Sequence, residues 1–94
     1  MTDNREVIFA AIWKDRHADI EVFLFEGEKT AIQWAEMKVH EHAYHPEDLD
    51  ESISEDWREA GCVYRGVYSC EGDSIRVMRV PVNKELQDGT EVQA

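Results

Sequence analysis

The first residues that could carry out chemistry are the histidines of one short segment. His40, His42 and His45 fall within six residues of one another. On a helix, His40 and His42 would point about 200° apart and could not share one metal ion. His42 and His45 are three residues apart, so they lie on one helix face and are the candidate metal ligands. The pair would need two further ligands, for which Glu41, Asp48 and a cysteine on the sheet are candidates.

The same histidines also have a structural interpretation, which we favour. His42 falls in the middle of the apolar arc of the predicted helix, where a packed imidazole needs only a hydrogen-bond partner. His45 lies near the predicted end of that helix, where the helix dipole stabilises a cation. We therefore expect His42 to contribute to packing, and metal binding by His42 and His45 is the alternative.

A second candidate is the polar segment from Asp15 through His17 to Asp19. A carboxylate that orients an imidazole can support general acid–base chemistry. The same residues also make a good structural turn, because aspartates accept hydrogen bonds from nearby backbone N–H groups. The segment lacks the length and the alternating carboxylates of a calcium loop. We favour the structural turn.

The two cysteines are predicted to be free thiols. Cys62 and Cys70 lie eight residues apart on one predicted strand, which separates them by ~26 Å when extended. A disulfide needs Cα atoms only ~4.4–6.8 Å apart. Neither has a histidine near it in sequence, and the scattered glycines form no phosphate-binding loop. No catalytic residue and no cofactor is therefore predicted.

The elements that must position these residues are two strand pairs around one helix. Strands are predicted at residues 7–13, 20–25, 62–70 and 74–82, a main helix from about residue 28 to 45, and a short helix at residues 54–60. These predict an α+β fold in which two β-hairpins form a four-stranded antiparallel sheet with the main helix on one face. The 94 residues are interpreted as one domain, with an ordered core at about 6–82 and a disordered tail at 83–94.

One helix can cover only one face of such a sheet, so the second face needs another partner. Ile20, Val22 and Leu24 are predicted to face the core, which leaves Phe23 and Phe25 on the opposite face. Cover could come from the segment that carries Trp57, from a second copy of the chain or from another protein. Phe23, Phe25 and Trp57 are accordingly the predicted interaction face.

Charge limits the classes of partner. The net charge is −11, from 21 acidic and 10 basic residues, so direct nucleic-acid binding is not expected. Solubility is the simplest explanation of this acidity, and the alternatives are attraction to a basic partner and mimicry of a nucleic-acid backbone. No apolar run is long enough for a membrane span. The polar first residues lack a signal-peptide pattern, so a cytoplasmic location is predicted.

Three segments carry a family resemblance. They are the 15–19 sequence DRHAD, the 31–35 sequence AIQWA and the 68–73 sequence YSCEGD. Together they resemble a pattern in small uncharacterised bacterial and archaeal proteins, over roughly residues 7–82. The resemblance implies the fold and implies no activity.

The favoured prediction of function is a small, acidic, non-enzymatic interaction or accessory protein, with a homodimer as one form. A second prediction is a small enzyme or metal-binding protein that uses His42, His45 and the 15–19 segment. A third is an acidic mimic of nucleic acid that binds a basic protein.

Overall fold

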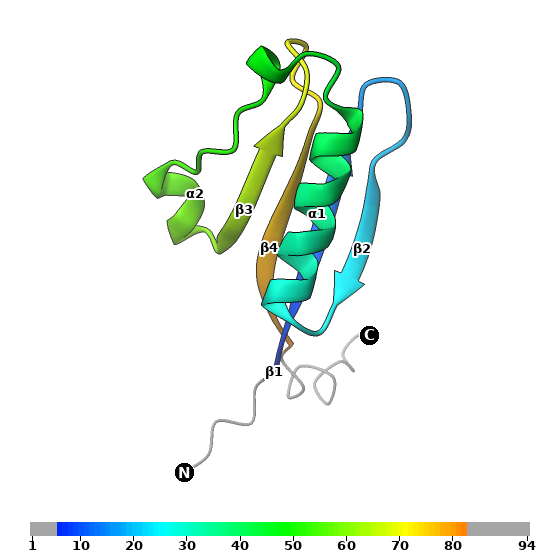
Figure 1. Cartoon of the computed structure of the whole chain (residues 1–94). Coiled ribbons are helices and arrows are strands. Elements are labelled where there is room, and N and C mark those ends of the chain that lie inside the picture. The colour runs from blue at the N-terminus through cyan, green and yellow to red at the C-terminus, as the bar shows by residue number, and fades with distance from the viewer. Residues whose placement is uncertain (1–5, 83–94) are drawn as a thin grey trace, which may run out of the picture.

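The structure is a computed structural model, and it describes residues 6–82. A strand pair precedes the main helix and a second strand pair follows it (Figure 1). The predicted tail at residues 83–94 lies outside the described residues. The elements in chain order are β1 (Glu6–Lys14), β2 (Glu21–Phe25), α1 (Glu28–His42), the 3-10 helix η1 (Pro46–Asp48), α2 (Glu55–Glu59), β3 (Cys62–Val67) and β4 (Ser74–Val82).

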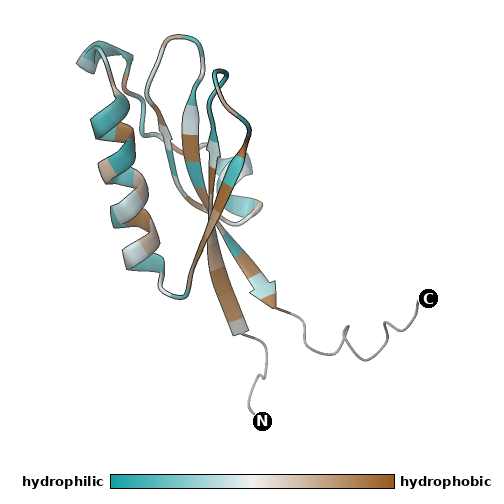
Figure 2. Cartoon of the chain, turned by 90° about the vertical axis from the view of Figure 1, so that its right-hand side faces the viewer, coloured by the Kyte–Doolittle hydropathy of each residue, from teal (hydrophilic) through white to brown (hydrophobic). Residues whose placement is uncertain are grey.

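The four strands form one antiparallel sheet in the order β2-β1-β4-β3. The first and last strands are the central pair, with a register that runs from Glu6 opposite Val82 to Lys14 opposite Ser74. Helix α1 lies along one face of this sheet, as the side view shows (Figure 2). The predicted α+β fold, with two hairpins, one main helix and a short second helix, is confirmed.

Helix α1 is pressed closely against the sheet. Its buried residues Ala31, Ala35 and Val39 are spaced four apart, and the two alanines let the backbones approach. At Gly66 in β3 a Cβ atom would lie only 2.8 Å from a methyl group of Val39, so the close approach depends on that glycine. Ile75 on β4 is completely buried beneath the helix.

Helix α1 ends at His42, three residues earlier than predicted. Ala43 already has extended backbone angles, with φ −72° and ψ 115°. Pro46 disfavours helical geometry at the residue before it, and His45 is extended as the cap of η1. His45 therefore lies outside the helix, and its ring packs against Tyr44 at 5.4 Å between centroids.

The predicted faces of β2 are wrong. Phe23 and Phe25 pack against the ring of Trp34 on α1, with centroid distances of 4.8 and 5.5 Å. Val22 and Leu24 lie on the opposite face and are 55% and 64% exposed, and Ile20, just before the strand, is 60% exposed. The positions from Val22 to Phe25 are apolar on both faces of the strand, and the two aromatic rings pack on the helix side, where Phe23 is still 36% exposed.

The second hairpin is shorter on its first side than predicted. Strand β3 ends at Val67, and Gly72 in the turn that follows has φ +92°, a left-handed conformation that glycine adopts without steric cost. Cys62 is buried in the strand, whereas Cys70 lies exposed in the turn, and both are free thiols.

Helix α2 begins after Ser54, whose hydroxyl accepts a hydrogen bond from the N–H of Trp57 at 3.3 Å. No helix within residues 6–82 combines the length and apolar character needed to cross a membrane.

Candidate functional sites

The two hairpin turns meet at one end of the sheet, because β1 runs antiparallel to β4. The backbone N–H of Arg16 donates to Asp73 Oδ1 at 2.9 Å, across 57 residues of sequence. Asp73 is buried, and its other oxygen accepts from the hydroxyl of Ser69 at 3.0 Å. An exposed ion pair joins Arg16 Nε to Glu71 Oε1 at 3.0 Å. The 15–19 loop and the 69–73 turn are thereby fixed to each other.

Tyr68 connects the sheet to the 15–19 loop. Its hydroxyl accepts a hydrogen bond from Trp13 Nε1 at 2.8 Å and donates to Asp15 Oδ2 at 2.5 Å. Asp15 Oδ1 also accepts from the backbone N–H of His17 at 2.8 Å. The Tyr68 bond, followed by the His17 bond, holds the pKa of Asp15 below its ordinary value. Burial, and then the Asp15 acceptor, raise the pKa of Tyr68 above its ordinary value. Asp15 is therefore a carboxylate at neutral pH, and Tyr68 is a neutral phenol.

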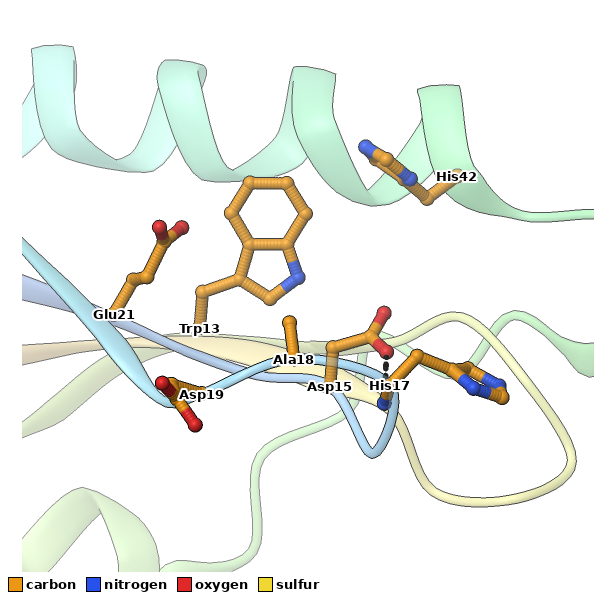
Figure 3. Close-up of a pocket in the computed structure, with 7 residues that line it drawn as sticks. All are labelled: Trp13, Asp15, His17, Ala18, Asp19, Glu21 and His42. Atoms are coloured by element: carbon orange, nitrogen blue, oxygen red, sulfur yellow. Dashed lines mark hydrogen bonds between the residues drawn. The ribbon is translucent and has the colours of Figure 1, made fainter.

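A pocket of about 290 Å³ lies beside this hydrogen-bond chain (Figure 3). The rings of Trp13 and His42 are 5.0 Å apart in an edge-to-face arrangement, and His42 comes from the end of α1. The carboxylates of Asp15 and Glu21 rise from the sheet on the same side as Trp13. The residues that line the pocket are Trp13, Asp15, His17, Ala18, Asp19, Glu21 and His42.

Not every polar residue of this pocket points into it. The carboxylate of Asp19 lies on the far side of the ribbon from Trp13, and the ring of His17 is turned outward (Figure 3). Glu21 is the cross-strand partner of Trp13, so the sheet register itself places the Glu21 carboxylate beside the indole. The pocket thus combines aromatic walls with two carboxylates.

The predicted ligand pair His42 and His45 is divided between two surroundings. His42 contacts the rings of Trp13 and Tyr68, at 5.0 and 5.7 Å between centroids. His45 lies beyond the end of α1 against Tyr44. The pocket does bring His42 to the 15–19 loop, as the second prediction of function supposed, but without His45.

A different histidine belongs to the group of potential metal ligands found within residues 6–82. Glu36 and His40, one turn apart on α1, offer ligand atoms within 4.8 Å of one another and of a Glu51 oxygen. His40 Nε2 lies 2.9 Å from Glu51 Oε2, which also accepts from the Tyr64 hydroxyl at 2.7 Å. Helical spacing places Glu36 beside His40, but sequence does not show that Glu51 folds back onto them. These contacts form an exposed polar network that ties the 50–52 segment to α1.

The sheet face opposite α1 carries aliphatic side chains on three strands. Cross-strand pairs place Ile12 beside Val22 and Ile8 beside Val80 on this face. Val22 and Leu24 are more than half exposed, and Val80 is 37% exposed. We call this surface the open face, and its members are Ile8, Ile12, Ile20, Val22, Leu24 and Val80.

Trp57 covers the other margin of the same sheet face. Its ring lies 5.6 Å from the guanidinium carbon of Arg65 and 5.2 Å from that of Arg76. Arg65 and Arg76 are opposite each other on β3 and β4. The predicted interaction face is therefore split, with Phe23 and Phe25 beneath α1 and Trp57 on the opposite side of the sheet.

Comparison of the chain with protein-family models, with curated proteins and with solved structures finds no match.

Proposed function

We propose that this protein functions as an interaction protein that binds another protein chain through the open face. The observation that carries the proposal is the exposure of Val22 and Leu24, at 55% and 64%, on the sheet face that α1 leaves uncovered, together with Ile20 just before the strand, which is 60% exposed. Such side chains are common singly on a surface, but a contiguous group over paired strands is typical of a binding surface.

The free energy of burial supports this choice. Fully burying a leucine or isoleucine side chain is worth about 1.5–3 kcal/mol, and the open face offers several in one flat layer. A second layer placed on this face would convert a two-layer helix-on-sheet arrangement into a three-layer one. Trp57 and α2 already cover the β3 margin, so the partner would occupy the β2, β1 and β4 side.

A second copy of the chain is the partner that we propose first. A two-fold dimer uses the same patch on both subunits, and the open face is apolar enough to be self-complementary. Strand β2 lies at the edge of the sheet, so it would form one border of the interface. The open face contains aliphatic side chains that can interdigitate when two sheets pack about 10 Å apart.

Sedimentation equilibrium of the wild type, Leu24→Ser and Met37→Ser tests this proposal. Met37 is a matched control, because it is an exposed apolar side chain on α1, and it is 49% exposed. We expect wild type and Met37→Ser to associate equally, and Leu24→Ser to raise the dissociation constant about tenfold or more. Equal association of all three proteins would show that the open face is not the interface. A wild type that stays monomeric at every concentration would contradict the dimer.

A further inference from the structure

We propose that the pocket between Trp13 and His42 binds the ammonium or guanidinium group of an organic cation. This site is separate from the open face, and its ligand is recognised by chemistry that the open face lacks. It is built from the end of α1, the neighbouring ends of β1 and β2, and the loop that connects these strands.

The aromatic wall of the pocket is held in a fixed position. Trp13 donates its indole N–H to Tyr68 at 2.8 Å and packs edge-to-face against Trp34 at 6.1 Å between centroids. His42 closes the wall from α1. A cation that lies over the face of a tryptophan ring, within about 6 Å of the ring centroid, is attracted to the ring, and the attraction grows when water is excluded. A wall that does not have to reorganise loses little entropy when a ligand binds.

Two carboxylates supply the charge. Asp15 uses one lone pair of each oxygen for Tyr68 and His17, so each oxygen keeps acceptor capacity for a ligand. Glu21 is exposed, and the basic side chains of the lining are the imidazoles of His17 and His42, with no lysine or arginine beside the two carboxylates. The net charge of −11 adds a general attraction for cations. An anionic ligand would meet repulsion from the two carboxylates.

The volume of the pocket and the types of group that line it favour an organic cation over a metal ion. A volume of about 290 Å³ is at the lower end of ordinary small-molecule pockets, so it suits a single side-chain-sized group. Calcium would require six to eight oxygen ligands, whereas two carboxylates face this pocket beside aromatic rings. An organic cation uses both the carboxylates and the rings. Its source is either a free small amine or a lysine or arginine side chain of another protein.

Titration of the protein with small probes, followed by NMR of ¹⁵N-labelled protein, tests the proposal. The probes are N-acetyl-arginine amide, N-acetyl-lysine amide and a short aliphatic diamine, with N-acetyl-citrulline amide as the uncharged counterpart of arginine. We expect saturable shifts of the Trp13 indole N–H and of the Glu21 amide, with a dissociation constant of about 1 mM or below. The citrulline probe should bind at least about tenfold more weakly.

Matched variants distinguish binding of the cation in the pocket from a general attraction of cations to an acidic protein. Glu21→Gln should weaken binding of the cationic probe about threefold to tenfold. Glu26→Gln makes the same change of charge just past the end of β2, outside the pocket lining, and should have little effect. Equal effects of the two variants, equal binding of citrulline, or shifts spread along the acidic 47–59 segment would overturn the proposal.

The same titrations identify the source of the cation. A diamine that binds as tightly as the amino-acid probes would indicate a free amine as the ligand. Tighter binding of an arginine or lysine probe when it is placed within a short peptide would indicate a side chain of a protein partner. Both results support a cation site. Monomeric wild-type protein would contradict the proposed dimer but would not affect this site, so the two proposals fail separately.

Discussion

Tyr68 joins a strand, a loop and the pocket through a single hydroxyl group. It accepts from Trp13 and donates to Asp15, and the residue is only 4% exposed. We predict that Tyr68→Phe lowers the free energy of unfolding by about 1–3 kcal/mol, because it leaves the partly buried indole N–H without its acceptor. Urea denaturation measures this, with Tyr44→Phe as control, since Tyr44 is 88% exposed. Equal effects of the two variants would mean that the Tyr68 hydroxyl adds no stability.

Asp15 makes the stability of the folded protein depend on pH in the acidic range. Its pKa is lowered first by the Tyr68 hydroxyl and then by the His17 N–H, so the folded state favours the charged carboxylate. That stabilisation is complete above the unfolded pKa of about 3.9 and is lost as the pH falls through the lower folded pKa. We predict that wild-type stability falls below about pH 4 more steeply than that of Asp15→Asn.

Urea denaturation of both proteins at a series of acidic pH values measures this difference. The control is Asp19→Asn, because the Asp19 carboxylate lies in the same loop but points away from Trp13 (Figure 3). Its curve should run close to that of the wild type. Parallel curves for the wild type and Asp15→Asn would contradict the assignment.

At the scale of elements, sequence predicts which segments form strands and helices better than it predicts which way they face. The glycine- and proline-free run before Pro46 predicts α1, and the Gly72 turn predicts the second hairpin, since both signals are local. Strand β2 is apolar at every position from Val22 to Phe25, so a period of two cannot choose its buried face. The choice depends on Trp34, which comes from another element.

The candidate pocket could be predicted only in part for the same reason. Local spacing indicates that His42 is on α1 and that Asp15 is in a turn. The meeting of the two hairpin turns depends on the pairing of β1 with β4, which are separated by most of the chain. Tyr68 was predicted as a strand residue, and nothing near it in sequence indicates that its hydroxyl would reach Asp15 across 53 residues.

The corrected faces of β2 lead to a paired prediction about stability. Phe25→Ser removes a ring packed at 5.5 Å from Trp34, and we expect it to lower the free energy of unfolding by about 2 kcal/mol or more. Leu24→Ser changes a side chain that is 64% exposed, and we expect a change within about 0.5 kcal/mol in monomeric protein. Chemical denaturation at low protein concentration measures both. A larger loss of stability in Leu24→Ser than in Phe25→Ser would instead support the predicted faces, with Leu24 toward the core.

At the scale of the whole molecule, the open face and the net charge act against each other. Burial of the open face favours association of two copies, whereas two chains of charge −11 repel each other. Salt screens this repulsion, since the Debye length falls from about 10 Å at 0.1 M to about 3 Å at 1 M, while burial of aliphatic surface does not require charge. We therefore predict that the proposed dimer becomes stronger as the salt concentration rises.

Sedimentation equilibrium at low and high sodium chloride concentrations measures the change in the dissociation constant. A dimer held by ion pairs through Arg65 and Arg76 would respond to salt in the opposite direction. These two arginines lie opposite each other under Trp57 on the same sheet face and form no ion pair within residues 6–82. If these arginines bound carboxylates of the second copy, salt would weaken the dimer, and Arg76→Gln would weaken it further at low salt. Strengthening by salt that Leu24→Ser abolishes and Arg76→Gln leaves intact would assign the association to the aliphatic side chains.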